Sequence, residues 1–299
     1  MYRALRFPEN PLIHPGLSDE LGHNINGPSL IRVPEWIPER LGRYYLYFAH
    51  HQGTHIRLAY ADRLGGPWQI YRGGVLRLAE TACRHHIASP DVQVMDDRKE
   101  LVMYFHGVTA AGQRTFRAAS RDGLHFVAAP VELGPFYFRV FPHAGAWFAL
   151  AKRTDAPGGG VVLRSPDGIQ PFEPGPAILP RQRHVAVLKR KDVVQIFFSR
   201  GGDCPERILV AEMKLAGDWR SWRPAEPVEV LRPQAEYEGG RLPLRPSEFG
   251  AVHTPVGELR DPAIFEEAGR IYLLYTGAGE SNICGAELID DEMSNCGHH

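Results

Sequence analysis

Several features that would assign a chain to a familiar class are missing from these 299 residues. The four cysteines contain no C-x-x-C pair, which argues against a disulfide framework or a thiolate zinc site and favours reduced thiols. No apolar run reaches the about 20 residues of a membrane helix, and the first residues lack a signal-peptide profile. The net charge of −1 gives no electrostatic reason to expect a nucleic acid or an anionic membrane as a partner. We therefore expect a cytoplasmic protein.

The sequence also lacks long stretches with 3.6-residue periodicity, and it has no phosphate-binding loop, dinucleotide fingerprint or G-x-S-x-G motif. It is rich instead in turn formers and aromatic residues, with 31 glycines, 25 prolines and 10% Phe, Trp and Tyr. This composition is typical of many short strands joined by tight turns. The fold is therefore predicted to be all-β.

Apolar, strand-like segments recur in groups of four, and the groups repeat five times along the chain at irregular intervals. The first segment of each group lies at 27–33, 89–95, 137–141, 184–189 and 261–265. In four groups a turn and an aromatic residue introduce the last segment, at Trp68, Phe126, Phe172 and Trp222. Radially repeated four-stranded antiparallel sheets form a β-propeller, so the sequence predicts five blades. A β-sandwich, the alternative, would not explain the fivefold order.

The fifth group lacks a fourth segment, because only a polar tail follows residue 288. The N-terminal segment 2–7 is the candidate that would supply this strand and close the ring, which would hide an open sheet edge. Residues 1–290 are thus expected to form one domain, with the Pro-rich stretch 224–257 as a long loop before blade 5. Residues 291–299 are expected to be a polar tail, and the final GHH is typical of a tag remnant.

The inner strand of each propeller blade lines the central channel, so residues at its start converge although they are distant in sequence. These positions carry Asn26 and Ser29 in blade 1, Ser89 and Asp91 in blade 2, Arg139 in blade 3, His184 in blade 4, and Arg260 with Asp261 in blade 5. We interpret Asp91 and Asp261 as equivalent, since each lies beside a proline at the start of a strand. Two carboxylates with Arg and His partners around a hollow predict an acid–base site. The alternative for each Asp is a turn at the start of a strand.

A site that uses two carboxyls as acid and base needs one protonated and one ionised, and neighbouring charges separate their pKa values. Asp91, Asp261 and Glu206 are the catalytic candidates, and Arg260 would keep the adjacent Asp261 ionised. Glu206 lies in a charged loop of blade 4, for which surface ion pairs are the alternative interpretation.

Further side chains of the predicted rim are candidates for binding substrate. The chain has 14 histidines, of which His51, His86 and His184 could contact substrate hydroxyls, or one could replace a missing carboxyl as general acid. Asn26 and Glu280 would line the same funnel. Trp36 would either stack on a sugar face or anchor its loop. No tight ligand spacing such as H-E-x-x-H appears, so no catalytic metal is expected.

The five-unit pattern, with SPDV opening blade 2 and LRDPAIF opening blade 5, resembles the five-bladed propeller glycoside hydrolases. The resemblance is to family 43-like arabinosidases and xylosidases, with families 32, 117 and 130 as relatives. It implies an exo-acting glycosidase that acts on a short oligosaccharide and requires no cofactor, and it allows a structural Ca²⁺ in the channel. Asp91 matches the family Asp that tunes the pKa of the acid. Blade 1 has Asn26 and Gly27 where the family has its Asp base, and the start of blade 3 has no Glu.

Two other functions stay open at this point. A phosphorylase like those of family 130 would need a basic pocket for phosphate, with Arg139, Arg181 and Arg183 as candidates. A non-catalytic propeller that binds sugar would fit the missing Asp in blade 1. In all three cases the expected partner is a small carbohydrate.

Overall fold

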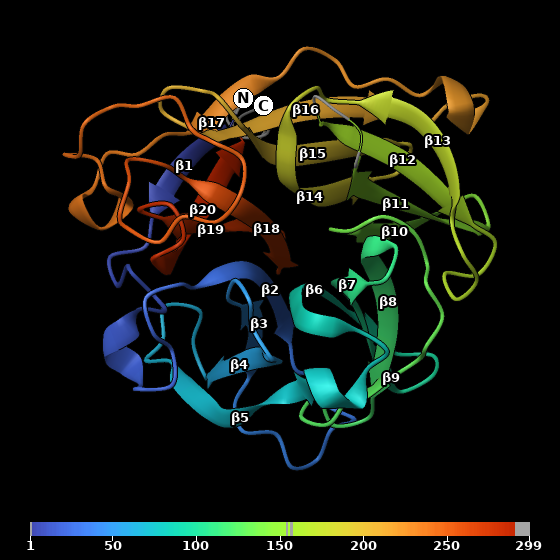
Figure 1. Ribbon diagram of the computed structural model, residues 1–299, viewed down its shortest axis with the longest axis horizontal. Coiled ribbons are helices and arrows are strands. Elements are labelled where there is room, and N and C mark those ends of the chain that lie inside the picture. The colour runs from blue at the N-terminus through green and yellow to red at the C-terminus, as the bar shows by residue number, and fades with distance from the viewer. Residues whose placement is uncertain (1, 154, 156–157, 291–299) are drawn as a thin grey trace, which may run out of the picture.

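The computed structural model describes residues 2–153, 155 and 158–290, which form five four-stranded antiparallel sheets arranged in a ring (Figure 1). Blade 1 contains β2 (Asn26–Arg32), β3 (Tyr44–Ala49), β4 (His55–Ala61) and β5 (Gln69–Arg77). Blade 2 contains β6 (Arg84–Met95), β7 (Glu100–Thr109), β8 (Gly112–Ser120) and β9 (Val127–Ala128). Blade 3 contains β10 (Arg139–His143), β11 (Ala146–Lys152), β12 (Gly160–Ser165) and β13 (Glu173–Ile178). Blade 4 contains β14 (Gln182–Arg190), β15 (Val193–Arg200), β16 (Ile208–Lys214) and β17 (Val228–Leu231).

Blade 5 confirms the predicted closure of the ring by the N-terminal segment. Its inner three strands are β18 (Arg260–Glu267), β19 (Arg270–Gly277) and β20 (Asn282–Asp290), and β1 (Tyr2–Arg6) is the outermost strand. The two ends pair antiparallel from Tyr2 opposite Asp290 to Arg6 opposite Ala286, side by side in Figure 1. This pairing covers the edge of β20 that would otherwise be open to another chain. The expected tail 291–299 lies outside the described residues.

The fourth strand of blade 4 differs from the expectation. The segment around Trp222 forms a 3₁₀ turn (Trp219–Ser221) instead of a strand, and β17 follows inside the stretch that the sequence suggested was all loop. The two tryptophans explain the difference, because both are buried against Phe148 of blade 3, with ring centroids 5.9 and 4.7 Å away. Packing between blades thus outweighs the strand-like pattern of this segment.

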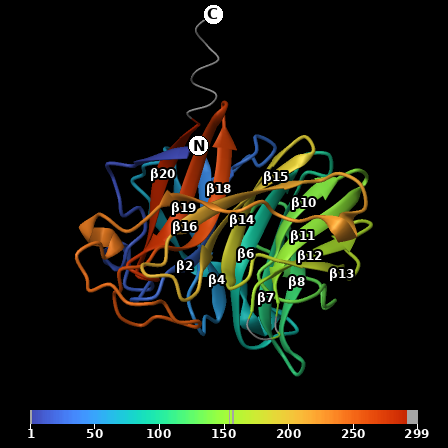
Figure 2. The same cartoon turned by 90° about the horizontal axis from the view of Figure 1, so that it is seen from above.

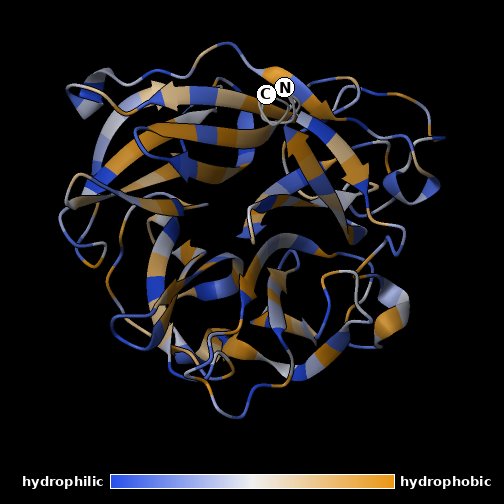
Figure 3. Ribbon diagram, turned by 180° about the vertical axis from the view of Figure 1, so that it is seen from behind, coloured by the Kyte–Doolittle hydropathy of each residue, from blue (hydrophilic) through white to orange (hydrophobic). Residues whose placement is uncertain are grey.

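Successive side chains of a strand inside a blade pack against different neighbouring blades, which explains why these strands are continuous apolar runs in the sequence. In β3, Tyr45 and Tyr47 pack into a cluster shared with blade 2, whereas Leu46 and Phe48 pack into a cluster shared with blade 5. Successive side chains of a strand point to opposite faces, so a sheet with neighbours on both sides needs apolar residues at every position. Five such clusters join the five pairs of neighbouring blades. In Figure 3 the orange, hydrophobic residues are concentrated on the strands of the blades.

Loops between the blade strands project from both ends of the ring, as the side view in Figure 2 shows. Among the described residues, helical structure is limited to four 3₁₀ turns, at Pro15–Leu17, Leu78–Glu80, Trp219–Ser221 and Glu236–Glu238. No helix in this part of the chain has the length and hydropathy that a membrane crossing needs.

A buried ion pair ties the closing strand to the ring, and its loss should be measurable. Arg6 of β1 donates from Nε and Nη2 to the fully buried carboxylate of Glu238, at 2.8 and 3.0 Å. We expect Arg6→Met to lower the free energy of unfolding by about 1–3 kcal/mol, because a buried carboxylate loses its charged partner. Chemical denaturation measures the change. Arg72→Met on the outermost strand of blade 1 is the control, since its pair with Glu20 is exposed and weak. Equal losses in the two variants would contradict the assignment.

Candidate active site

Residues from all five blades line a cavity of about 270 Å³ at the start of the inner strands. The sequence-predicted residues among them are Asn26, His51, His86, His184, Asp261 and Glu280. Ser89, which was expected at the start of its inner strand, and His106 line it too, whereas Gln113, Tyr137 and Lys152 were not predicted for the site. The convergence predicted for the inner strands therefore occurs, but with a partly different set of side chains.

A shared backbone kink determines which residue of each inner strand faces the cavity. Gly27, Ser89 and Asp261 all have left-handed φ values, +59°, +49° and +47°, and a proline follows each of them. At each of these places the register of the strand ladder shifts, as it does at a β-bulge. A bulge re-aims the side chain at the kink. The counterpart of Asp261 in blade 2 is therefore Ser89, and the interpretation of Asp91 as its equivalent was wrong by two residues.

Asp91 lies after the kink and does not line the cavity. Its carboxylate accepts hydrogen bonds from the backbone N–H of Val140, at 2.9 Å, and from Nε2 of Gln93, at 3.3 Å. Burial raises its pKa, although Arg139 and these hydrogen bonds oppose the rise. Asp91 thus joins blade 2 to blade 3, and the structure does not bring it together with Asp261 in one pocket.

Glu206 is fully buried, so the interpretation of its surroundings as a solvated loop with surface ion pairs is wrong for this residue. It accepts hydrogen bonds from Nε of Arg183, at 2.9 Å, and from Oγ of Ser199, at 2.6 Å. Nε of Arg260 is 3.7 Å from the same carboxylate. Glu206 is not among the residues that line the cavity; it lies behind Arg183, which does. Its position is that of a supporting residue.

Two more predicted site residues lie away from the cavity. Arg139 is buried, and its guanidinium donates to the carbonyl oxygens of Pro28, Pro90 and Phe138. It therefore fastens the inner strands of blades 1, 2 and 3 to each other. Trp36 donates from Nε1 to Asp96 at 2.8 Å and packs on the core between blades 1 and 2. Of the two interpretations of Trp36, the structure supports the loop anchor.

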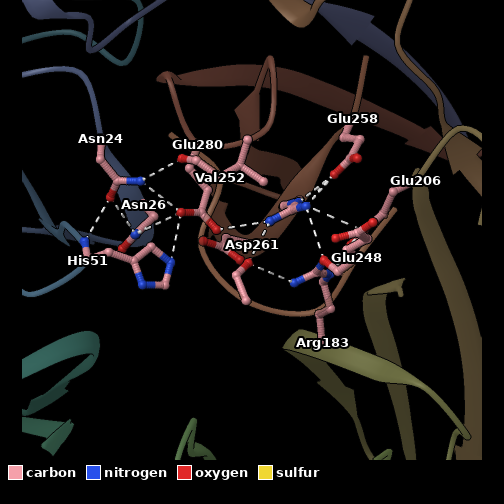
Figure 4. Close-up of polar contacts among 12 residues, drawn as sticks. Asn24, Asn26, His51, Arg183, Glu206, Glu248, Val252, Glu258, Asp261 and Glu280 are labelled. Carbon is pink, nitrogen blue, oxygen red and sulfur yellow. Dashed lines mark hydrogen bonds and ion pairs between the residues drawn. The ribbon is translucent and has the colours of Figure 1, made fainter. Parts of the chain in front are cut away.

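Arg260 is the shared partner of three buried carboxylates, Glu206, Glu258 and Glu280, which are labelled in Figure 4. Only 1% of the residue is exposed, and it donates from Nε and Nη2 to Glu258 and from Nη1 to Glu280, the latter at 3.2 Å. Its Nη1 also donates to the carbonyl of Gly250. Arg260 thus orients Glu280 from behind and does not itself reach the cavity.

His51 and Glu280 form the first of two imidazole–carboxylate pairs in the cavity (Figure 4). His51 Nε2 is 2.8 Å from Glu280 Oε2, and Asn24 Nδ2 donates to the same oxygen at 2.9 Å. Burial lowers the pKa of His51, but the hydrogen bond and charge of Glu280 outweigh burial and leave it above the usual value. Burial would raise the pKa of Glu280, and the His51 contact leaves it below its usual value. The pair therefore holds an imidazolium next to a carboxylate.

His184 and Asp261 form the second pair. Nδ1 of His184 is hydrogen-bonded to Oδ1 of Asp261, and Oδ2 of Asp261 accepts the backbone N–H of Gly27 at 3.1 Å. Burial would raise the pKa of Asp261, but His184 and Arg260 keep it well below its usual range. Burial lowers the pKa of His184, and Asp261 offsets only part of that effect. His184 is therefore a neutral imidazole near pH 7, with Nδ1–H on Asp261 and Nε2 free to accept a proton.

Two cations face the same cavity from blades 3 and 4. Lys152 lies over the rings of Phe136, Tyr137 and Phe249, and burial, followed by the charge of Arg183, lowers its pKa to about 8. Within the described part of the chain, Nη2 of Arg183 is buried and has no hydrogen-bond partner.

His86 also lines the cavity, and burial lowers its pKa. In the described residues no group of three or more His, Cys, Asp or Glu is arranged to hold a metal.

Comparison with known proteins identifies a viral relative of the chain. No protein-family model matches the chain. The chain is 34% identical to an uncharacterized protein of Acanthamoeba polyphaga mimivirus over 326 residues, which covers 95% of this chain and 90% of the viral protein. The chain belongs to the family of that protein.

Solved structures with the same architecture are glycoside hydrolases. A glycosyl hydrolase from Bacteroides ovatus superposes with a TM-score of 0.70 and 13% identity, over 98% of this chain and 95% of that one. A thermostable family-43 glycoside hydrolase gives a TM-score of 0.63 with 13% identity, over 90% and 91%. The family-43 enzyme of Xanthomonas citri, in complex with xylose, gives 0.59 with 14% identity, over 96% and 90%. The predicted resemblance to the five-bladed propeller hydrolases is thus confirmed at the level of the fold.

Proposed function

We propose that the protein is a glycoside hydrolase that removes one sugar from the end of a short oligosaccharide. The observation that carries the proposal is the cavity with its two imidazole–carboxylate pairs, His51–Glu280 and His184–Asp261. One pair stabilises a protonated imidazole and the other a neutral one, as a general acid and a general base require. The fold shared with glycoside hydrolases supports the same reaction class.

The size of the cavity supports an exo-acting enzyme. Its volume of about 270 Å³ lies just below the about 300–1,000 Å³ of typical ligand pockets, which suits a single sugar ring. A groove for the middle of a long chain would be open at both ends, whereas residues from all five blades line this cavity. The terminal sugar would enter, and the rest of the substrate would extend outward past the rim.

His51 is the group that we assign as general acid. Its side chain is 30% exposed, against 5% for Glu280, so it is the member of the pair that substrate reaches. The imidazolium would donate its Nδ1 proton to the leaving oxygen while Nε2–H stays on Glu280. The carboxylate stabilises the charged form before the transfer and holds the ring in place, much as the Asp of a catalytic triad holds its His.

His184 is the group that we assign as general base. Both oxygens of Asp261 are already engaged, one by His184 and the other by the backbone of Gly27, so Asp261 acts by positioning His184. Nε2 of His184 would take a proton from a water molecule that attacks the anomeric carbon. A single displacement by water inverts the configuration at that carbon.

Replacement of Glu280 tests the acid. Because Glu280 raises the pKa of His51, Glu280→Gln should shift the alkaline limb of kcat/KM to lower pH, where the imidazolium is lost earlier. The measurement is a pH profile on whichever member of an aryl-glycoside panel the wild-type protein hydrolyses. Glu100→Gln is the control, since Glu100 pairs with Arg117 on blade 2 outside the cavity. An unmoved alkaline limb in Glu280→Gln would refute the assignment of His51.

Phosphorolysis is the second candidate, and the cations of the cavity favour it. Of the three arginines expected to bind phosphate, only Arg183 lines the cavity, where Lys152 joins it. Arg139 is held by carbonyl groups, and Arg181 donates to Gly201 and lines another cleft. Assays of the aryl-glycoside panel with and without added phosphate distinguish hydrolysis from phosphorolysis. Turnover only with phosphate would establish the phosphorylase, and sugar binding without turnover would establish a non-catalytic propeller.

A further inference from the structure

Ser89 lies in the cavity beside His184, and the proposed glycoside hydrolysis gives its hydroxyl no role. Oγ of Ser89 is 3.4 Å from Nε2 of His184, and Nδ1 of His184 is hydrogen-bonded to Asp261. The three residues come from the inner strands of blades 2, 4 and 5, and all three line the cavity. A hydroxyl next to the free nitrogen of an imidazole whose other nitrogen is held by a carboxylate is the arrangement of a Ser-His-Asp triad.

The backbone at Ser89 supports a role for its side chain beyond packing. Ser89 has φ +49°, in the left-handed region that residues with a side chain adopt only at an energetic cost. The equivalent position in blade 1 is Gly27, which adopts φ +59° without that cost. The kink itself therefore needs no serine. It presents the hydroxyl to the cavity from a sharp strained turn, as nucleophilic serines are presented in other hydrolases.

We propose that Ser89 is a nucleophile and that the cavity cleaves the acyl ester of an O-acylated sugar. The choice of a sugar ester rests on the proposed glycosidase function, whereas the nucleophile rests on the triad geometry alone. The Ser89–His184 distance lies slightly beyond the about 2.6–3.2 Å of a formed hydrogen bond, a looseness that is common before substrate binds.

The reaction proceeds in two balanced steps. Oγ of Ser89 attacks the ester carbonyl carbon while Nε2 of His184 takes the hydroxyl proton. The tetrahedral intermediate releases the sugar oxygen, which receives that proton from His184, and an acyl-Ser89 ester remains. Water then attacks the acyl carbon and gives its proton to His184, which returns it to Ser89 as the carboxylic acid leaves. Asp261 stabilises the imidazolium in both steps.

The cavity also holds positive charge for the oxyanion of the intermediates. Lys152 and Arg183 both line it. Tyr137 packs edge-on against His184, with ring centroids 3.8 Å apart, and keeps the imidazole facing Ser89. Positive charge that is already in place costs no reorganisation when the oxyanion develops.

Labelling of the full chain with a fluorophosphonate tests the nucleophile. The wild-type protein should gain one phosphonyl group, mapped by mass spectrometry of peptides to Ser89, and should hydrolyse 4-nitrophenyl acetate. Ser89→Gly is the informative variant, because glycine already occupies the equivalent kink in blade 1 and should preserve folding. It should not be labelled, and its kcat/KM for the ester should fall at least about 100-fold. Thermal unfolding at or above the wild-type temperature would verify that it is folded.

Ser281→Ala is the matched control, since Ser281 lies at the start of the β20 hairpin with its hydroxyl on the carbonyl of Ala278. It should be labelled at the wild-type rate. Absence of label at Ser89, or equal ester hydrolysis by folded Ser89→Gly, would overturn the proposal. Aryl-glycoside turnover is measured separately. Label at Ser89 without glycoside turnover would leave the esterase standing and reject the glycosidase, and the reverse result would reject the esterase alone.

Discussion

His184→Gln should lower kcat/KM for the hydrolysed glycoside by about 10²- to 10⁴-fold, the range by which a positioned general base accelerates proton transfer. The substitution keeps a polar side chain of similar length that can still hydrogen-bond Asp261. It removes the imidazole nitrogen that accepts the proton from water. Loss of activity should therefore come from chemistry and not from collapse of the cavity.

The pH profile distinguishes this role from a structural one. Burial holds the pKa of His184 below 6.5, so the wild-type rate should persist as the pH falls through 6.5 and decline only as His184 becomes protonated. The residual activity of His184→Gln should lack that acid limb. His143→Gln is the matched control, because His143 packs on Trp222 and does not line the cavity. If His184→Gln hydrolysed the glycoside with the wild-type kcat/KM, His184 could not be the general base.

The propeller architecture could be predicted from the sequence because each strand carries its own pattern of apolar residues. Alternating apolar residues mark each strand, and the same four-strand group recurs five times. The missing strand after residue 288 even pointed to β1 as its substitute. The strand predicted around Trp222 was wrong. Its sequence resembles a strand, but contact with Phe148 of another blade determines the local structure.

The site was predicted less well, because a kink of one residue changes which side chain faces the cavity. Asp91 and Asp261 look alike as acids beside proline, but one precedes its proline and the other follows it. Alignment of the three prolines would have matched Asp261 with Ser89. Lys152 gave no comparable signal, since it ends an ordinary strand and reaches the cavity only through the ring geometry.

Burial also could not be inferred from charge. The loop around Glu206 is dense in charged residues, a pattern typical of solvent-exposed segments, yet Glu206 is fully buried with Arg183 and Ser199. Arg183 and Ser199 belong to other strands of the same blade, and Arg260, 3.7 Å away, comes from blade 5. The contacts that compensate the burial of Glu206 therefore form only when these strands are assembled, and the loop sequence does not reveal them.

Arg260→Met should be the most destabilising single substitution near the site. Arg260 is 1% exposed and compensates Glu258 and Glu280 directly, with Glu206 at 3.7 Å. Methionine has a similar length but no charge, so these carboxylates would stay buried without their shared partner. Breaking a buried ion pair from one side costs about 3–5 kcal/mol. Chemical denaturation should show a loss of at least that size, or no folded protein at all.

Arg270→Met provides the comparison, because Arg270 is 59% exposed and pairs with a single surface carboxylate, Glu287. It should change the free energy of unfolding by no more than about 1 kcal/mol. If Arg260→Met cost as little, the carboxylates beneath the cavity would have to be protonated in the folded protein. Glu280 would then lack the charge that holds His51 as an imidazolium, and the proposed acid would fail with it. The stability of the ring and the chemistry of the cavity therefore depend on the same guanidinium.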